Sequence, residues 1–404
     1  MSRLAVLHSL KYRDFRWLVI SSFASFMAMN MQMISRGWLV LRLANDSPFA
    51  LSLVMMAFSL PITFLSLIGG ALADRFSRKH IIVVCQIGNA LLTFTLATLD
   101  QAGLIRFWHL LVVGLINGSL MAFNMPSRQS IISNIVPFDG LTNAIALSSS
   151  ALNLTRIAGP GLAGLLIIYI DTSGVFYLNS GLYLFAALSI AMLRTGKEPA
   201  SRSRKSMSGD IREGFSYAMK DPILLGLIIM LFLSTLFGFP YIPLLPAWAR
   251  EVLGVRSDSL GLLMMMMGLG GFTGTMILAS LQAYKKRGAL LLMTCLLWGV
   301  AICIFSKSTT YTITLPLLFI VGLIGQFFMT LSMTLLQVYS SVEMRGRVMS
   351  ISMLTFGLMP LSAVPFGAIA ENIGTANSLF YSGAILIVLT IIFALWDRKL
   401  SEVA

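Results

Sequence analysis

Two arginines offer the clearest chemistry in this chain, because Arg36 and Arg156 are charged residues that fall inside its long apolar segments. A charge near the centre of a bilayer costs at least about 2.5–3.5 kcal/mol, so such a side chain is expected to face a cavity or a partner. Arg36 shares one helical face with Ser25, Met29 and Gln32. It lies about five residues, or roughly 8 Å, from the end of its segment. Its guanidinium therefore either lines a cavity or snorkels to the external interface.

Arg156 lies deeper in its segment, on a helical face that also carries Asn153 and Pro160. We expect Arg156 either to have a cavity or coupling role or to bind backbone carbonyls that Pro160 leaves without a donor. Asn117 and Asn124 share a face of the preceding segment, and we expect both to line the same cavity. The cores of the apolar segments contain no Asp or Glu. A cavity holding these arginines therefore favours anionic or polar neutral ligands.

Metal, redox and enzyme chemistry are not expected. The three histidines lie at segment ends, and the three cysteines are odd in number and lack metal-ligand spacing. Methionines at alternate positions of the first segment would scatter around a helix, so they favour apolar packing over a copper site. An enzyme would need His, Cys or acidic groups that converge within the membrane. The sequence therefore predicts no catalytic residue, no metal and no cofactor.

The composition is that of an integral membrane protein: 57% of the 404 residues are hydrophobic and 11% are charged, against roughly 25% charged in soluble domains. Apolar segments of about 20 residues recur along the whole length, which favours helices in a lipid bilayer over a barrel. The net charge of +13 does not indicate nucleic-acid binding, because most Lys and Arg residues fall in the loops of one side. That asymmetry predicts a multi-pass protein of the inner membrane with both termini in the cytoplasm.

An all-α fold of twelve membrane-spanning helices is predicted. The expected spans are about 17–41, 49–72, 81–99, 107–126, 141–170, 175–194, 222–245, 258–281, 288–306, 312–337, 347–370 and 376–396. A basic cytoplasmic linker, 195–221, separates an N-terminal six-helix bundle, 1–194, from a C-terminal one, 222–404. Within the linker, Gly209–Lys220 predicts a short interfacial helix, although a regulatory or lipid-sensing role is an alternative to a plain linker.

The two halves echo one another at an offset of about 206 residues. Val136–Gly140 corresponds to Val342–Gly346, and Phe176-Tyr177 corresponds to Phe380-Tyr381 at a slightly smaller offset. Six predicted spans separate each pair, so both copies have the same orientation. Two parallel six-helix repeats around a central cavity are typical of transporters that work by alternating access.

A dense group of charges lies between the second and third predicted spans. Its residues are Gly70, Asp74, Arg75, Arg78 and Lys79. So many cations, with an acid and a glycine, exceed what an orientation signal requires, and we interpret the segment as a hinge between moving helices. Arg345 and Arg347, before the eleventh predicted span, lie on the same cytoplasmic side.

These features resemble the major facilitator superfamily. Gly70–Lys79 is similar to the cytoplasmic motif of that superfamily, with Ser77 in place of its usual second glycine. Gly159-Pro160, followed by Gly164, resembles the Gly-Pro motif that its exporters carry in the fifth span. The glycines allow a neighbouring helix to approach closely, and Pro160 weakens its own helix. Asn124–Arg128 and Arg345–Met349 resemble the branch that includes the enterobactin exporter and macrolide-efflux proteins.

The resemblance implies a monomeric efflux transporter for a small-molecule substrate, a bulky siderophore-like compound or a drug, with protons as the coupling ion. It also implies a cytoplasmic gate in which Asp74 is attracted to Arg345 and Arg347. Many proton-driven exporters carry an Arg and a Gln in the fourth span, where this chain has Gly114 and Asn117, so the proton carrier is not identified. A facilitator or importer of a small metabolite with the same fold is the alternative, which the Gly-Pro motif argues against.

Overall fold

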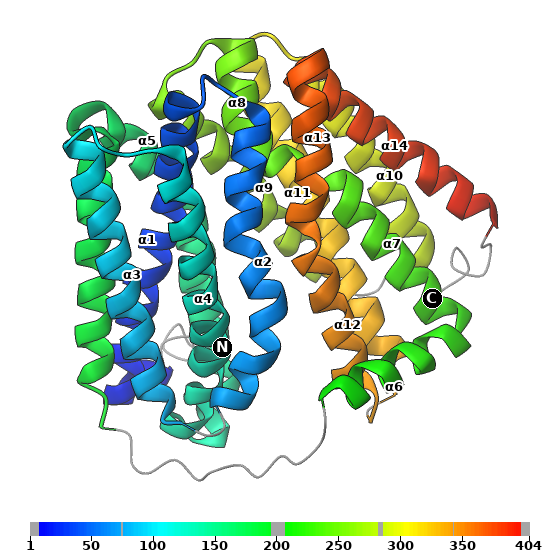
Figure 1. Cartoon of the computed structure of the whole chain (residues 1–404). Coiled ribbons are helices and arrows are strands. Elements are labelled where there is room, and N and C mark those ends of the chain that lie inside the picture. Colours follow the sequence, from blue (N-terminus) through cyan, green and yellow to red (C-terminus); the bar gives the residue numbers. More distant parts are fainter. Residues whose placement is uncertain (1–7, 74–75, 195–206, 282–285, 342, 397–404) are drawn as a thin grey trace. The chain divides into compact units, whose positions relative to one another are not determined.

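A computed structural model describes residues 8–73, 76–194, 207–281, 286–341 and 343–396 (Figure 1). These residues form fourteen α-helices and one short 3₁₀ helix, His8–Lys11, and the described part contains no strand. Ten helical segments of the described chain are long and apolar enough to cross a membrane. One of them, within α5 (Phe138–Ala191), is long enough to cross twice, and α12 (Arg345–Gly357) with α13 (Met359–Ile373) covers the eleventh predicted span. The predicted all-α membrane fold is therefore confirmed, and its elements fit twelve spans.

The first of two compact units comprises Met1–Ala44, Ala57–Ser203 and Arg256–Met265. Its helices are α1 (Arg13–Leu43), α3 (Arg78–Gln101), α4 (Phe107–Ile135), α5 (Phe138–Ala191) and the greater part of α2 (Pro48–Ala73). Within this unit α1 and α3 pack lengthwise against α5, and α3 packs against α4 (Figure 1). Phe15, Leu18, Ile82, Ile131 and Ile190 form a buried apolar cluster that joins these four helices.

Helix α5 contains two spans because its backbone breaks at Asp171. This residue has φ 56° and ψ 179°, outside the helical region, and the chain resumes a helical path immediately afterwards. Its own carboxylate accepts a hydrogen bond of 2.6 Å from the Thr172 amide, as at the start of a helix. The break falls between the predicted spans 141–170 and 175–194, in agreement with the sequence.

The second unit comprises Asn45–Met56, Arg204–Val255 and Met266–Ala404. Its helices are α6 (Met207–Lys220), α7 (Pro222–Gly238), α8 (Tyr241–Leu253), α10 (Arg287–Ser306), α11 (Tyr311–Tyr339), α12 (Arg345–Gly357), α13 (Met359–Ile373), α14 (Thr375–Trp396) and most of α9 (Ser257–Ser280). The short helix predicted in the linker is confirmed as α6. The seventh and eleventh predicted spans are each divided, and a proline, Pro240 or Pro360, lies at each division. The expected bundle boundaries at 194 and 222 stay a prediction.

An aromatic core fills the second unit. Trp298 is fully buried, with Phe239 and Phe328 ring centroids 4.9 and 5.9 Å away. Gly238 and Gly325 leave room for the indole, because a Cβ added at either position would lie less than 3 Å from the ring. Among the described residues, the buried Arg, Asn and Gln side chains all lie in the first unit, where most of the predicted site residues also lie.

Candidate functional site

Arg36 is the centre of a polar network inside the first unit. Its side chain, on α1, is buried, with 6% of its surface exposed. Nη2 donates a hydrogen bond of 3.0 Å to Oδ1 of Asn117 on α4, and Nδ2 of Asn117 donates one of 2.7 Å to Oδ1 of Asn89 on α3. The guanidinium carbon lies 5.4 Å from the ring centroid of Phe58 on α2. Arg36 therefore points into the unit, and it does not snorkel to the external interface.

Gln32 extends this network one turn along α1. Its Nε2 donates to Thr93 Oγ1 at 3.4 Å, and its Oε1 accepts a hydrogen bond of 3.1 Å from the hydroxyl of Tyr183, in the second span of α5. Two turns further along the same face of α1, Ser25 Oγ accepts a hydrogen bond of 2.8 Å from Nε2 of Gln86 on α3. The polar face predicted on the first helix is thus matched by a polar face on α3.

A small pocket lies beside this network. It is lined by Ser25, Met29, Phe58, Asn89, Asn117, Met121, Asn124 and Tyr183. It has room for about one water molecule. Asn124 is 3% exposed, and its Oδ1 has no hydrogen-bond partner. Asn117 and Asn124 therefore do share a lining, as their spacing predicts.

The fourth span was predicted to end at residue 126, which would leave Arg128 in a loop, and the structure corrects this. Helix α4 continues through Pro126 to Ile135, and Arg128 is buried within it, with 4% of its surface exposed. Its Nη1 donates hydrogen bonds to the hydroxyls of Ser22, at 2.7 Å, and Ser21, at 3.4 Å. The spacing of 117, 121, 124 and 128 repeats every three to four residues, so the polar face of the fourth span gave a signal for Arg128.

Arg156 and Asn153 occupy a different environment. Arg156 lies in the first span of α5, fifteen positions before the break at Asp171, and its side chain is exposed, while Asn153 is half-buried. Neither residue lines the pocket around Asn117. The cavity role predicted for Arg156 and Asn153 stays a prediction, and the structure does not place them with Arg36.

The glycines of the Gly-Pro motif lie at two close helix crossings. A Cβ added at Gly159 would be 2.7 Å from the Cβ of Asn30 on α1. A Cβ added at Gly164 would be 2.9 Å from the Cα of Gly261, in the part of α9 that belongs to the first unit. Gly261 in turn faces the carbonyl oxygen of Pro160, at 2.6 Å from its own added Cβ. Close approach of neighbouring helices, predicted from these small residues, is confirmed.

The charged segment Gly70–Lys79 is described only in part. Gly70 lies in α2, Asp74 and Arg75 fall outside the described residues, and Arg78 and Lys79 begin α3. Arg78 donates to the carbonyl of Ser130 near the end of α4, at 3.0 Å, and Lys79 donates to the carbonyl of Leu193 after α5, at 2.6 Å. Both cations therefore bind carbonyls near helix C-termini, where a positive charge is favourable.

The arginines before the eleventh predicted span have partners within the second unit. Arg347 Nη1 forms an ion pair of 2.5 Å with Glu213 of α6, and Arg345 donates through Nε to the carbonyl of Gln337, at 2.9 Å. Glu213 was not predicted as a partner of Arg347. The predicted attraction between Asp74 and these arginines stays a prediction.

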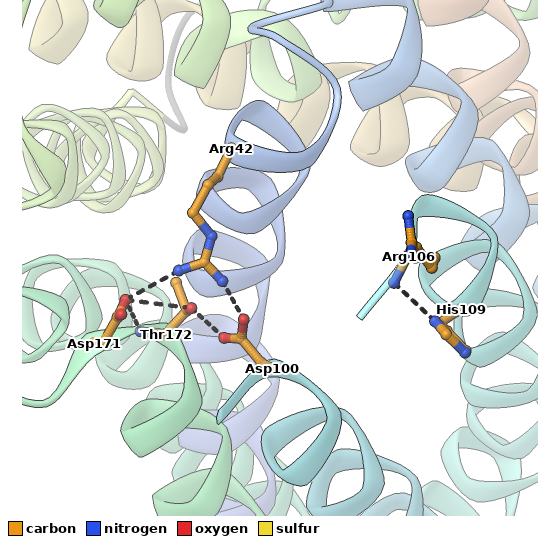
Figure 2. A network of polar contacts seen from close by, with 6 residues as sticks. All are labelled: Arg42, Asp100, Arg106, His109, Asp171 and Thr172. Atoms are coloured by element: carbon orange, nitrogen blue, oxygen red, sulfur yellow. Dashed lines mark hydrogen bonds and ion pairs between the residues drawn. The ribbon is translucent and has the colours of Figure 1, made fainter. Parts of the chain in front are cut away.

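A second ionic network, absent from the sequence-based predictions, joins three helices of the first unit. Arg42 at the end of α1 forms ion pairs with Asp100 at the end of α3 and with Asp171 at the break in α5, and Thr172 donates through its hydroxyl to Asp100 (Figure 2). The side chain of Asp100 is 2% exposed, whereas that of Arg42 is 42% exposed. Nearby, the Arg106 amide donates to Nδ1 of His109 at 2.8 Å. We interpret this network as a structural tie.

The chemistry available to the site is polar binding. Within the described residues no group of three or more His, Cys, Asp or Glu side chains could hold a metal ion. The three cysteines are free, and Cys85 and Cys295 are buried. The buried polar side chains of the first unit include amides, hydroxyls and two guanidinium groups, which suits recognition of an acceptor-rich or anionic ligand.

Comparison with known proteins matches residues 4–403 to the family model described as transmembrane secretion effector. The staphyloferrin A transporter of Staphylococcus aureus is 25% identical over 95% of this chain and 96% of its own length. The multidrug efflux pump Tap of Mycolicibacterium fortuitum is 25% identical over 83% of this chain and 84% of its own. Among solved structures, the nucleoside transporter NupG aligns over 95% of this chain and 98% of its own, with a TM-score of 0.75 and 14% identity. The predicted resemblance to the efflux branch is confirmed, since macrolide efflux and enterobactin export proteins also match.

Proposed function

Because the chain belongs to the transmembrane secretion effector family of the major facilitator superfamily, and is thus a multi-pass membrane transporter, we propose that it exports a bulky organic compound from the cytoplasm. The proposed substrate is a siderophore-like molecule or a drug. Transport proceeds by alternating access between two six-helix bundles in the inner membrane, with both termini cytoplasmic and the protein acting as a monomer.

The observation that carries the proposal of export is the crossing of α5 with α1 and with the start of α9. Gly159 and Gly164 allow backbone contact there, and Pro160 weakens the helix between them. Such a crossing can seal tightly in one conformation and open in another, because no side chains have to disengage. The relative from Mycolicibacterium fortuitum is a multidrug efflux pump, which supports the same direction of transport.

The substrate path is proposed to follow the polar faces of α1, α4 and α5. Its residues are Gln32, Arg36, Asn117, Asn124, Asn153 and Arg156. The cytoplasmic gate is proposed to form from the loop that contains Asp74 and from Arg345 and Arg347. We propose protons as the coupling ion, by analogy with exporters of this superfamily.

The test is a substrate screen followed by counterflow. Cells that lack their own exporters express this protein. They are then tested for resistance to candidate compounds and for loss of these compounds, siderophores and drugs, from the cells. A compound found in this way is then loaded into proteoliposomes to learn which gradient drives its exchange. Export should lower the cellular content of the compound, and a protonophore should abolish that effect. Accumulation of the compound in the cells would identify an importer, and efflux that survives the protonophore would exclude proton coupling.

A further inference from the structure

The buried arginines of the first unit lack charged partners. Arg36 contacts the neutral side chain of Asn117 and the ring of Phe58, and Arg128 contacts two serine hydroxyls. Among the described residues, neither arginine forms an ion pair. The Nε atoms of both guanidinium groups are buried and have no hydrogen-bond partner. Neutral partners orient a guanidinium but leave its charge uncompensated, and a buried unpaired charge is strongly destabilising.

The exposed arginine nearby has the opposite arrangement. Arg42 lies six residues after Arg36 on α1, or roughly 9 Å along the helix. It is 42% exposed, and it nevertheless pairs with both Asp100 and Asp171 (Figure 2). The carboxylates thus neutralise the arginine that water already reaches. The positions around Arg36 that could have supplied a carboxylate carry amides, Asn89 and Asn117.

The position of Arg36 beside the pocket offers a place for the missing charge. Both of its contacts, Asn117 and Phe58, line that pocket. Gly118 holds α4 directly against the backbone of Phe58, because an added Cβ would overlap the Phe58 carbonyl oxygen. Asn124 adds a buried amide whose NH₂ group can donate to a bound group. The space holds about one water molecule, so it suits an ion or a ligand end group of about that size. A water molecule there would leave the charge of Arg36 uncompensated.

We propose that Arg36 is an anion-binding site, occupied either by a carboxylate group of the transported compound or by a small inorganic anion such as chloride. The planar guanidinium, held by Asn117, presents its remaining N–H groups to an anion and binds a carboxylate through paired hydrogen bonds. Asn89 and Asn124 supply amide groups that contact the bound group. Where the anion belongs to the substrate, this inference rests on the proposed function and assigns its substrate to acidic organic compounds.

The test measures thermal unfolding of the purified full-length protein in nanodiscs, in low-salt buffer, during titration with sodium chloride or with sodium succinate. A bound anion raises Tm in a saturable manner, by about 3 °C at a hundredfold excess over Kd. Arg36→Gln should abolish that rise. Arg106→Gln removes the same charge from an exposed position and should leave the rise unchanged.

A variant that introduces a negative charge beside Arg36 gives a second, independent readout. Asn117→Asp places a carboxylate at the atom that already lies 3.0 Å from the guanidinium. It should raise Tm in the absence of added anion and remove the response to both salts. This outcome requires only that the variant fold, and it does not depend on Arg36→Gln being stable.

The outcomes distinguish an organic carboxylate from an inorganic anion, and they test the anion site separately from the proposed export function. A response to succinate that exceeds the response to chloride assigns the site to an organic carboxylate, and the reverse assigns it to an inorganic anion. An identical response in the wild type and in Arg36→Gln, or no response at all, overturns the proposal. If Tm rises in a saturable manner but the protein exports no tested compound, the anion site stands and the proposed function fails. If export is normal but added anion does not change Tm, the proposed function stands and the anion site fails.

Discussion

Gly261→Ala tests the close crossing of α5 and the start of α9. The added Cβ would lie 2.6 Å from the carbonyl oxygen of Pro160, 3.1 Å from the Cα of Gly164 and 3.3 Å from the Cα of Gly161. All three atoms belong to the backbone of α5, so no side-chain rotation can relieve the overlap. Ordinary van der Waals contact requires the helices to move apart by roughly 0.8 Å at this point.

The expected cost follows from two opposing terms. Overpacking of a close contact costs about 1–3 kcal/mol, while alanine gains about 0.5–1 kcal/mol over glycine inside a helix. We therefore expect Gly261→Ala to lower the free energy of unfolding by about 0.5–2 kcal/mol and to slow transport, because the crossing can no longer close.

The assay is thermal unfolding of the purified protein together with the initial rate of substrate efflux from proteoliposomes. Gly181→Ala is the matched control, because Gly181 lies in α5 and an added Cβ there has no heavy atom within 4 Å. This control should be as stable as the wild type or slightly more stable, and fully active. If Gly261→Ala matched Gly181→Ala in both measurements, the crossing would not need its glycines and the reasoning would be wrong.

Two further substitutions separate structural from functional charges. Arg128→Met should leave Tm unchanged or raise it, because Ser21 and Ser22 still donate to backbone carbonyls. Efflux by this variant should fall. A lower Tm with normal efflux would show that the role of Arg128 is structural. Asp100→Asn should lower the free energy of unfolding by about 1–2 kcal/mol, a value that allows for the exposure of Arg42. This loss of stability should be smaller in high salt, which unfolding measurements at two ionic strengths would test. An equal cost at both would contradict an ionic origin.

The polar face of the first helix was predictable, because spacing alone places Gln32 and Arg36 together. Their partners were not, since Asn89 and Tyr183 are brought in by the packing of α3 and α5. Arg128 was misplaced because the fourth span was predicted to end at residue 126, the position of a proline. A helix within a bundle tolerates proline when neighbouring groups satisfy the freed carbonyl, so the helix continued past it.

Charges at helix ends were harder still to interpret from the sequence. Asp100 lies at the end of its helix, where a carboxylate is normally solvated, yet it is covered because α5 breaks beside it at Asp171. Such burial depends on the neighbouring segment, so the spacing of residues around Asp100 in the sequence does not indicate it. In contrast, the close approach of neighbouring helices at Gly159 and Gly164 was predicted correctly, because small residues at helical spacing near a proline directly indicate it.

The Arg42 network also determines how local opening should be distributed along the first unit. It ties the ends of α1 and α3 to the turn within α5, so these three elements can separate at that end only if Asp100 gives up both Arg42 and Thr172 (Figure 2). Amide hydrogens around Asp100 and Thr172 should therefore exchange slowly with deuterium, and this end of the unit should open late.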